Sequence, residues 1–470
     1  MADDPQEDAV ATVKPGWGIT IGYAGYALPA GLMIPPFSLL LPAFYSQVMG
    51  VSLAVVGGVV GAFRIYDLIL NPILGVLSDR TQTRFGRRKP WMIAGMPLLA
   101  VGLWLVFAPP VTHGSALYLG IALFVFYTGS SLVMIPYYAL GAEVPATPYG
   151  RARMLGLREA VMMAALVFAG LCPLAAKAFG FAAASRETML IILGTLVVLT
   201  PPALAALLFV VPDKVPPQEV VPRFSLLEIM RDFWDALIRN RAFGRLAVAY
   251  AVINFAIFTD QALNLFFLSK ILRIEQVFGV ALLVQGVMTV AAAPLWVWLS
   301  KRIELHKVIA ISIVLASLFR AGAYSWLPPG AAGAYLIIQA IGAVLFSGTL
   351  VLASAIQATA IDYGSLVSGR ERAGTYISAN NIVTQFAAAL PFIVVFPLLE
   401  FAGFSATGTN TPFSLQLLRV LTIYGALPFQ LISAWLIWNF PISRKQAAEN
   451  SGQLLLQRNA EIEIGALPAP

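Results

Sequence analysis

Twelve stretches of about 20 or more mostly apolar residues interrupt this chain, and they constrain its fold more than any other feature. A helix of that length crosses the hydrocarbon core of a bilayer. Charged residues make up only 11% of the chain, against about 25% in soluble proteins. We therefore predict an all-α polytopic membrane protein with 12 transmembrane helices. They span approximately residues 20–47, 52–77, 91–109, 115–141, 156–178, 188–211, 244–268, 277–299, 307–327, 332–358, 375–401 and 413–439.

Lysine and arginine are unequally divided between the two sets of loops. The loops after the even-numbered stretches contain most of them, whereas the opposite set has only Lys177, Arg186, Lys270 and Arg273. Loops rich in lysine and arginine stay in the cytoplasm. We therefore expect a protein of the plasma (bacterial inner) membrane with both termini cytoplasmic. The net charge of +7 is explained by these loops, and we expect no nucleic-acid partner.

The longest internal connection, residues 213–243, separates the apolar stretches six from six. Ser225 and Glu228 form a capping box there, ahead of an amphipathic pattern. That helix would lie on the cytoplasmic membrane face, or pack on the bundle as a linker helix. A weak repeat relates residues 71–80 to 293–302, as in the duplicated halves of secondary transporters. The predicted organisation is a tail (1–19), a half (20–212), the linker, a second half (244–440) and a tail (441–470).

The second apolar stretch contains charged residues in its interior. Its segment RIYDLILN places Arg64, Asp67 and Asn71 one helical turn apart, on one face of a helix. A charge at mid-membrane costs about 2.5–3.5 kcal/mol on insertion scales, so such residues are usually functional. From the residues alone, Asp67 is either a functional residue or neutralises Arg64 in a structural pair.

The loop after that stretch, GVLSDRTQTRFGRRKP, is densely charged. We predict that it forms a gate with charged residues that follow the fourth and tenth stretches. Exposed ion pairs contribute only about 0–1 kcal/mol each, which suits contacts that must break. The same loop is a topology signal. The predicted gate residues are Asp79, Arg80, Arg84, Gly86, Arg87, Arg88, Glu143, Arg151, Arg153, Asp362, Arg370 and Arg372.

Four segments resemble the glycoside-pentoside-hexuronide:cation symporters of the major facilitator superfamily, the family of the melibiose permease. They are RIYDLILNPILG, the basic loop, MIPYYALGAEVPATPYGRARMLGLREA and AIDYGSLVSGRERAGTYISANNIVTQFAAAL. The resemblance implies the major facilitator fold, in which two six-helix halves rock about a central site. It implies a transporter and no enzyme, and the sequence has no phosphate-cradling Gly-Lys-Ser/Thr loop of an ATP-driven pump.

The resemblance also implies site residues. It places the coupling cation at Asp67; the family usually has a second acid one turn later, where this chain has Asn71. Coupling to sodium, coupling to protons and absence of coupling therefore all remain open. The sugar site is expected among the first, fourth, fifth and eleventh stretches, at Tyr23, Tyr26, Tyr127, Ser131, Arg158, Asn380, Asn381 and Gln385.

The seventh stretch adds Asp260 and Asn264, one turn apart, as further substrate-site candidates. Asp260 is either a gate or site residue or part of a structural pair, for which Arg320 is a possible partner. No acid lies in the first or fourth stretch, where several relatives use acids to bind sugar hydroxyls.

The function that we predict is cation-coupled symport of a glycoside or other small sugar by alternating access. The alternative substrate within the family is a lysolipid or other amphiphile. The alternative from another class is a non-transporting membrane sensor or binding protein on a transporter scaffold. We expect a monomer in a lipid bilayer, with no cofactor and no metal apart from a coupling Na+ or H+.

Overall fold

A computed structural model describes residues 16–144, 148–213, 234–235, 237–368, 373–450 and 452–454. Within these residues the chain is helical, and its β-structure is limited to one isolated bridge between Thr83 and Gly86. Twelve helical segments of this part are long and apolar enough to cross a membrane. The predicted all-α fold with 12 transmembrane helices is confirmed.

The helices follow the predicted stretches closely. Proline and π-turns interrupt the first and last spans, which packed membrane helices tolerate. The helix of the tenth predicted stretch, α13 (Ala332–Ser368), ends ten residues beyond its predicted end at 358. The elements are α1 (Trp17–Gly25), α2 (Ala27–Pro35), η1 (Pro36–Leu40), α3 (Leu41–Gln47), α4 (Leu53–Arg80), α5 (Lys89–Phe107), α6 (Ala116–Glu143), α7 (Pro148–Ala178), α8 (Arg186–Val210), α10 (Arg241–Phe266), η2 (Phe267–Leu272), η3 (Glu275–Val277), α11 (Phe278–Ser300), α12 (Leu305–Ser325), α13 (Ala332–Ser368), α14 (Ala373–Phe401), α15 (Pro412–Val420), η4 (Leu421–Gly425) and α16 (Leu427–Trp438).

The chain divides into two compact units. The first comprises Met1–Val51, Tyr66–Pro222 and Phe278–Leu283, and the second comprises Ser52–Ile65, Arg223–Val277 and Val284–Pro470. The predicted linker helix at Ser225 and Glu228 lies outside the described residues, as do most of the two tails. The predicted domain boundaries therefore stay a prediction.

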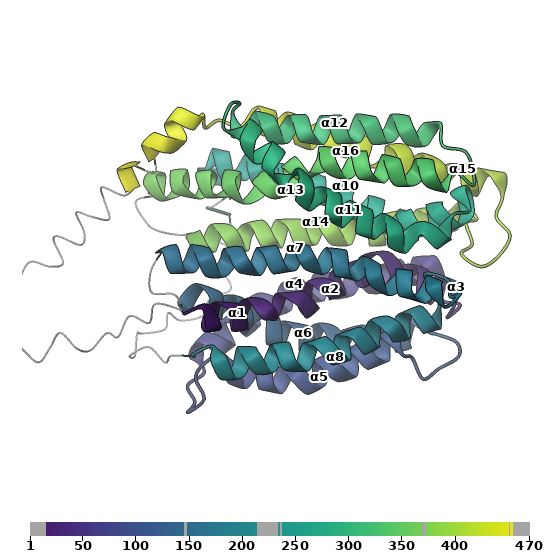
Figure 1. Cartoon of the computed structure of the whole chain (residues 1–470), viewed down its shortest axis with the longest axis horizontal. Coiled ribbons are helices and arrows are strands. Elements are labelled where there is room, and N and C mark those ends of the chain that lie inside the picture. Colours follow the sequence, from purple (N-terminus) through teal and green to yellow (C-terminus); the bar gives the residue numbers. More distant parts are fainter. Residues whose placement is uncertain are drawn as a thin grey trace, which may run out of the picture. The chain divides into compact units, whose positions relative to one another are not determined.

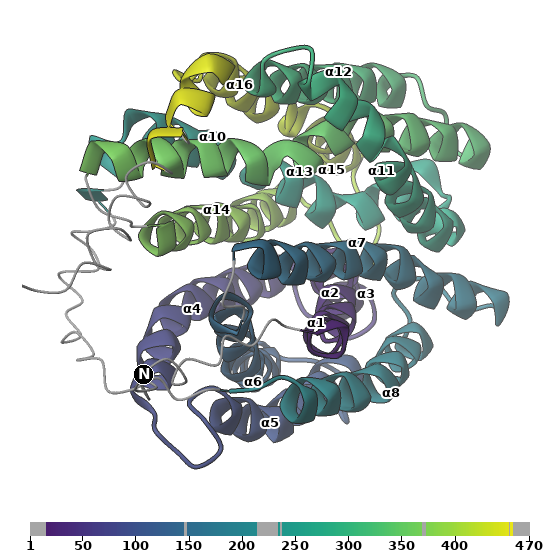
Figure 2. The ribbon, with the colours of Figure 1, turned by 60° about the vertical axis from the view of Figure 1, so that its left-hand side comes forward.

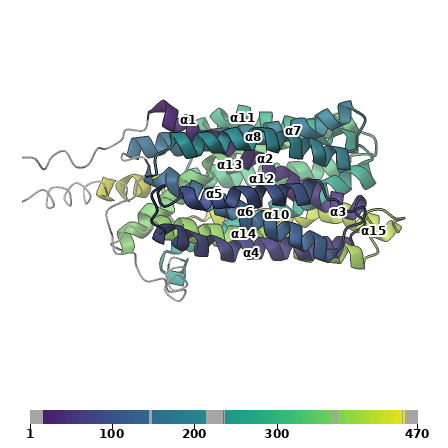
Figure 3. The ribbon, with the colours of Figure 1, turned by 90° about the horizontal axis from the view of Figure 1, so that it is seen from below.

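In the first unit, α1 and α2 pack on α7 and α8 (Figure 2). The helices α5 and α6 lie side by side (Figure 3) and approach closely at glycines. A Cβ added to Gly102 would lie 2.4 Å from the Cα atom of Phe126, and one on Gly129 would lie 2.3 Å from the backbone nitrogen of Leu99. Small residues of this kind let membrane helices approach backbone to backbone.

In the second unit, α10 packs on α14 and α16, and α12 packs on α13 and α16 (Figure 1). The core between them contains large aromatic residues whose polar atoms are satisfied. Trp296 donates its indole N–H to the carbonyl of Val344 at 2.8 Å, and Tyr250 donates to the carbonyl of Ala353 at 2.7 Å. Buried tyrosine and tryptophan usually find such partners, so these bonds fix the packing of α13 in this unit.

The first turns of α4 belong to the second unit because they pack tightly on α14. A Cβ on Gly57 would lie 2.2 Å from the carbonyl oxygen of Phe392. The Glu400 carboxylate near the end of α14 accepts hydrogen bonds from the Ser52 hydroxyl at 2.8 and 2.9 Å and from the Ala54 amide at 2.6 Å. A carboxylate there satisfies free amide groups and favours the positive end of the helix dipole. Glu400 therefore caps the N-terminus of α4.

Candidate functional site

Asp67 lies in the interior of α4 and is surrounded by polar oxygen and nitrogen atoms of the first unit. Ser131 of α6 donates its hydroxyl to Asp67 Oδ1 at 2.5 Å, and the Asn71 amide donates to Oδ2 at 3.3 Å. The Oδ1 atom of Asn71 is buried and makes no hydrogen bond within the described residues. Carboxylate, hydroxyl and amide oxygens are the ligands that hard cations prefer. The geometry thus suits binding of a small cation or a proton.

Arg64, one turn before Asp67, contacts aromatic rings of the second unit. Its guanidinium carbon lies 4.6 Å from the ring centre of Phe258 in α10 and 4.8 Å from that of Phe392 in α14. Contacts of a cation with a ring face contribute about 0.5–2 kcal/mol, most when desolvated. These two rings stabilise the arginine charge inside the membrane, and sequence reasoning did not foresee them.

Three tyrosines form a cluster in the interior of the first unit. The ring of Tyr137 in α6 stacks on Tyr23 of α1 at 4.6 Å and meets the edge of Tyr26 at 5.1 Å. All three side chains are 0% exposed, and none of their hydroxyls makes a hydrogen bond of normal geometry within the described residues. Buried hydroxyls usually form hydrogen bonds, so the three tyrosine hydroxyls can still donate or accept further hydrogen bonds. Tyr137 was not among the predicted residues.

Arg158 of α7 lies beside an exposed aromatic ring. Its guanidinium carbon is 5.2 Å from the ring centre of Tyr138, and it forms an ion pair with Glu159. Tyr138 is 42% exposed and the Glu159 side chain is 54% exposed. A ring face next to a charged pair can contact both the apolar face and the hydroxyls of a sugar. Sequence reasoning missed Tyr138 and Glu159, although Glu159 directly follows the predicted Arg158.

The remaining predicted substrate residues divide between the units. Tyr127 of the first unit is half-buried against the rings of Phe126, at 5.3 Å, and Phe37, at 6.4 Å. In the second unit, Asn380 is buried in α14, whereas Asn381 and Gln385 are exposed on that helix.

Asp260 of α10 forms an ion pair with Arg320 of α12, the partner that the sequence suggested. Gln430 of α16 donates its amide to Asp260 Oδ2 at 3.3 Å, while Asp260 Oδ1 is buried without a hydrogen bond. The two charges therefore join three helices of the second unit. A charge in this position is stabilised mainly by its partner, because water is largely excluded.

A chain of polar residues continues from this ion pair. The Arg320 guanidinium lies 5.3 Å from the ring centre of Tyr324, which donates its hydroxyl to Gln339 at 2.7 Å. Tyr335 stacks on Tyr324 at 5.9 Å and accepts a hydrogen bond from the predicted Asn264 at 3.4 Å. Asp260 and Asn264 thus belong to one connected network.

Arg88 is the centre of the charged cluster in the basic loop. It forms ion pairs with Asp79 and with Glu143, and its Nη1 atom donates to the Ser78 hydroxyl at 2.5 Å. Burial disfavours its charge, but the hydrogen bond and charge of Glu143 outweigh burial and raise the pKa of Arg88. Arg87 also pairs with Glu143, at 3.3 Å. The Arg88 guanidinium therefore links the end of α4 to the end of α6.

Asp213, just after α8, joins the same loop and was not among the predicted residues. Its Oδ2 atom accepts hydrogen bonds from the backbone amides of Arg88 at 2.7 Å and Lys89 at 2.9 Å. Gly86 makes room for this carboxylate and has a φ of +103°, which side-chain-bearing residues rarely adopt.

The other predicted gate residues are more dispersed. Arg153 of α7 donates to the Thr20 hydroxyl at 3.2 Å and lies 4.8 Å from the ring centre of Trp17. Arg84 lies over the ring of its neighbour Phe85. Arg80 ends α4, and Asp362 is half-buried in α13. Arg370, Arg372 and the side chain of Arg151 lie outside the described residues.

Replacing Gly86 with alanine is expected to weaken this loop by about 1–3 kcal/mol of backbone strain alone. The added Cβ would also lie 2.1 Å from Asp213 Oδ2, so Asp213 must leave the amides that it caps. Thermal unfolding of the purified protein measures the loss. Gly180→Ala is the matched control, because Gly180 has a φ of +84° and nothing within 4 Å of an added Cβ. Equal losses in both variants would show that the Asp213 contact contributes nothing.

Among the described residues, no group of three or more His, Cys, Asp or Glu side chains could hold a metal ion.

Comparisons with known proteins place the chain in a family. The sequence profile described as "MFS/sugar transport protein" matches residues 22–444. A glucuronide carrier protein homolog of Escherichia coli is 24% identical over 442 residues, which covers 92% of this chain and 94% of the relative. A putative glycoside/cation symporter of E. coli, YagG, is 28% identical over 133 residues, or 28% of this chain and 29% of the relative.

Solved structures agree on the fold. The structure of the nucleoside transporter NupG aligns with a TM-score of 0.65 at 12% identity, covering 91% of this chain and 100% of that one. At this identity the likeness concerns the fold alone. Together with the profile match over most of its length, these findings show that the chain is a membrane transporter, not an enzyme, and that it belongs to the glycoside-pentoside-hexuronide:cation symporter family of the major facilitator superfamily.

Proposed function

We propose that this protein carries a glycoside or other small sugar together with a cation, by alternating access of its two halves. The observation that carries the coupling is the environment of Asp67, an interior carboxylate hydrogen-bonded by Ser131 and Asn71. A carboxylate in a membrane helix is costly when charged. Binding of a proton or Na+ neutralises it, and this lowers the free energy of moving the helix past apolar surroundings.

The ligands around Asp67 allow either ion. A proton needs only the carboxylate. Sodium needs several oxygens, which here are Asp67, the Ser131 hydroxyl and the free Oδ1 atom of Asn71. Asn71 supplies an oxygen but no charge, so sodium would be bound less tightly than between two acids. Arg64, whose guanidinium contacts the rings of Phe258 and Phe392, remains part of the proposed coupling site through its charge.

The proposed sugar site contains Tyr138, Arg158 and Glu159. The exposed Tyr138 ring offers a face for the apolar side of a sugar ring, and the Arg158–Glu159 pair offers donors and acceptors for hydroxyls. The relatives support this substrate class, since their names include a glucuronide carrier homolog, a glycoside/cation symporter and a lactose permease. Arginine would also suit the carboxylate of a uronic acid.

The Arg88 cluster is proposed as the cytoplasmic latch. Its ion pairs with Asp79 and Glu143 and the cap from Asp213 hold three helix ends of the first unit together. The Asp79 and Glu143 side chains are 45% and 34% exposed, so water can solvate these carboxylates when a conformational change breaks the ion pairs. This role includes the expectation that both termini are cytoplasmic, in the inner membrane of a bacterium.

Uptake by proteoliposomes tests the proposal. The purified protein is given a panel of glucuronides, galactosides and pentosides, with an imposed sodium or proton gradient. A membrane potential of 100 mV supplies about 2.3 kcal/mol per coupled charge, or roughly 50-fold accumulation. We expect one of the two gradients to drive accumulation of a sugar. A lack of gradient-stimulated sugar uptake would contradict the proposal, and uptake of lysophospholipid instead would make the substrate an amphiphile.

A further inference from the structure

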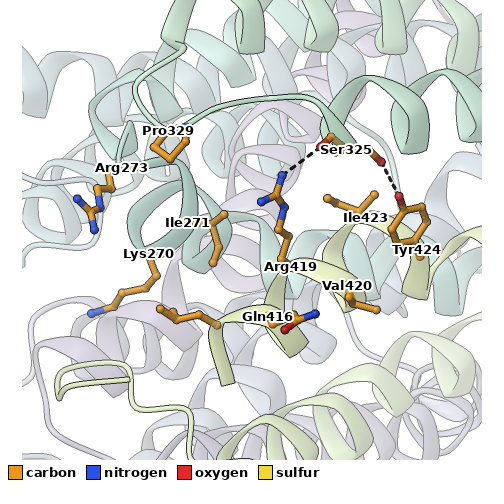
Figure 4. A pocket seen from close by; sticks show the side chains of 11 residues that line it. Lys270, Ile271, Arg273, Ser325, Pro329, Gln416, Arg419, Val420, Ile423 and Tyr424 are labelled. Atoms are coloured by element: carbon orange, nitrogen blue, oxygen red, sulfur yellow. Dashed lines mark hydrogen bonds between the residues drawn. The ribbon is translucent and has the colours of Figure 1, made fainter. Parts of the chain in front are cut away.

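A basic cavity of about 650 Å³ lies within the second unit, and no residue of the proposed transport site lines it. It is formed by the end of η2, the turn between α12 and α13, and the helices α15 and η4 (Figure 4). Its polar lining includes Lys270, Arg273 and Arg419 together with Ser325 and Tyr424, and no acidic side chain lines it. Three positive charges therefore surround one cavity without a compensating negative charge in its wall.

The cations of this cavity are held in place but are not neutralised. Arg419 donates to the backbone carbonyl of Ser325 at 3.1 Å, and the Ser325 hydroxyl bonds to the Tyr424 hydroxyl at 2.6 Å (Figure 4). Neither Lys270 nor Arg273 forms an ion pair within the described residues. Like charges held close together repel one another, and an anion bound between them offsets this repulsion energy.

The backbone at Arg273 is a second, independent sign. Its φ is +56°, and it is the only non-glycine residue of the described chain with a positive φ. Such a conformation costs about 1–3 kcal/mol and is found at ligand clamps. The preceding Leu272 accepts a hydrogen bond from Gly330 at 2.8 Å, which ties the turn after α12 to η2. The wall of the cavity is therefore preorganised around an arginine in an unfavourable conformation.

The distribution of charge along the chain makes this cluster of basic residues unusual. The loops opposite the basic ones have only Lys177, Arg186, Lys270 and Arg273, and this cavity is lined by two of these four together with Arg419 of α15. Of the other two, Arg186 is already bonded to backbone carbonyls. The positive-inside rule selects against charge on this side, so a cluster there needs a reason beyond topology.

The rim of the cavity is apolar and faces outward. Ile271, Val420 and Ile423 line it, and Val420 and Tyr424 are 44% and 45% exposed on a membrane-spanning helix. An occupant that matches this surface has a negative head group and an apolar tail. We infer that the cavity binds the phosphate head group of an anionic phospholipid from the outer half of the membrane. A free phosphate ion shares the charge but would leave the apolar rim without contacts.

The test measures binding of phosphatidylglycerol to the purified full-length protein in detergent, by native mass spectrometry. Phosphatidylcholine and inorganic phosphate are the comparison ligands. We expect phosphatidylglycerol to bind more tightly than phosphatidylcholine. The double variant Lys270→Gln/Arg419→Gln should bind it roughly 25-fold more weakly, at about fivefold for each basic residue near an anionic lipid. Arg273 is left unchanged so that its backbone conformation is not disturbed.

The matched control is Lys301→Gln/Arg302→Gln, two exposed cations of the same unit that do not line the cavity. It should keep the affinity of the unaltered protein. Equal affinity for the two lipids, or unchanged affinity in the double variant, would overturn the inference. So would inorganic phosphate that displaces the lipid at equal concentration, because the site would then take a free anion. If the double variant does not fold, Arg419→Gln alone should show the fivefold loss. Sugar uptake is measured separately, so failure of the transport proposal would not affect this result.

Discussion

Asp67→Asn is expected to abolish gradient-driven accumulation while leaving substrate exchange across the membrane intact. Asparagine keeps the size of the side chain and its contacts with Ser131 and Asn71, but it can neither accept a proton nor offer a charge to sodium. Accumulation should fall from roughly 50-fold per 100 mV to equilibration. Uptake in proteoliposomes with an imposed gradient measures the first quantity, and exchange of labelled for unlabelled substrate measures the second.

Ser131→Ala is the matched control for Asp67. It removes one hydrogen bond to the carboxylate but keeps the charge, so accumulation should persist with a changed dependence on cation concentration. If Asp67→Asn accumulates substrate as well as the unaltered protein, Asp67 is structural and its coupling role is wrong.

Asp260→Asn is expected to destabilise the second unit by about 3–5 kcal/mol, because it leaves the Arg320 guanidinium buried beside a neutral amide. The Gln430 amide also loses its charged acceptor. Thermal unfolding of the purified protein measures the effect. The double variant Asp260→Asn/Arg320→Gln should recover most of the loss, since no unpaired charge then remains.

An exposed ion pair provides the comparison for this result. Glu449 pairs with Lys445 at 3.8 Å on the surface, with side chains 55% and 88% exposed. Glu449→Gln should change stability by no more than about 1 kcal/mol. A similar small effect at Asp260 would mean that water reaches the Asp260–Arg320 pair and that its role is not structural.

The sequence predicted the spans and the basic loop because their signals are local. Hydropathy over about 20 residues and the positions of lysine and arginine need no knowledge of packing. The Asp260–Arg320 ion pair could also be predicted from the sequence, for a related reason. Two single charges in apolar stretches are expensive alone, so each implies a partner, and few candidates exist.

The contacts that sequence reasoning missed depend on how each helix is rotated about its axis. Asp213 accepts a hydrogen bond from the amide of Arg88, which lies 125 positions away in the sequence, and no local sequence pattern around either residue predicts this contact. The rings that flank Arg64 come from α10 and α14, in the other half of the sequence. The state of the Tyr137 hydroxyl also cannot be predicted from a sequence, because only the structure shows that it is buried without a hydrogen bond within the described residues.

The helix α4 contains Asp67 and contacts both α14 and Arg88, and Pro72 in its interior affects how easily it bends. Proline lacks an N–H, so the carbonyl of Leu68 has no helical donor, and the helix is easier to bend beside Asp67. The turns before this point pack on α14 and are capped by Glu400, whereas the last turn meets Arg88 through Asp79. With 28 residues, α4 is about 42 Å long. A bend of a few degrees beside Asp67 would therefore move the distant ends of α4 by ångströms.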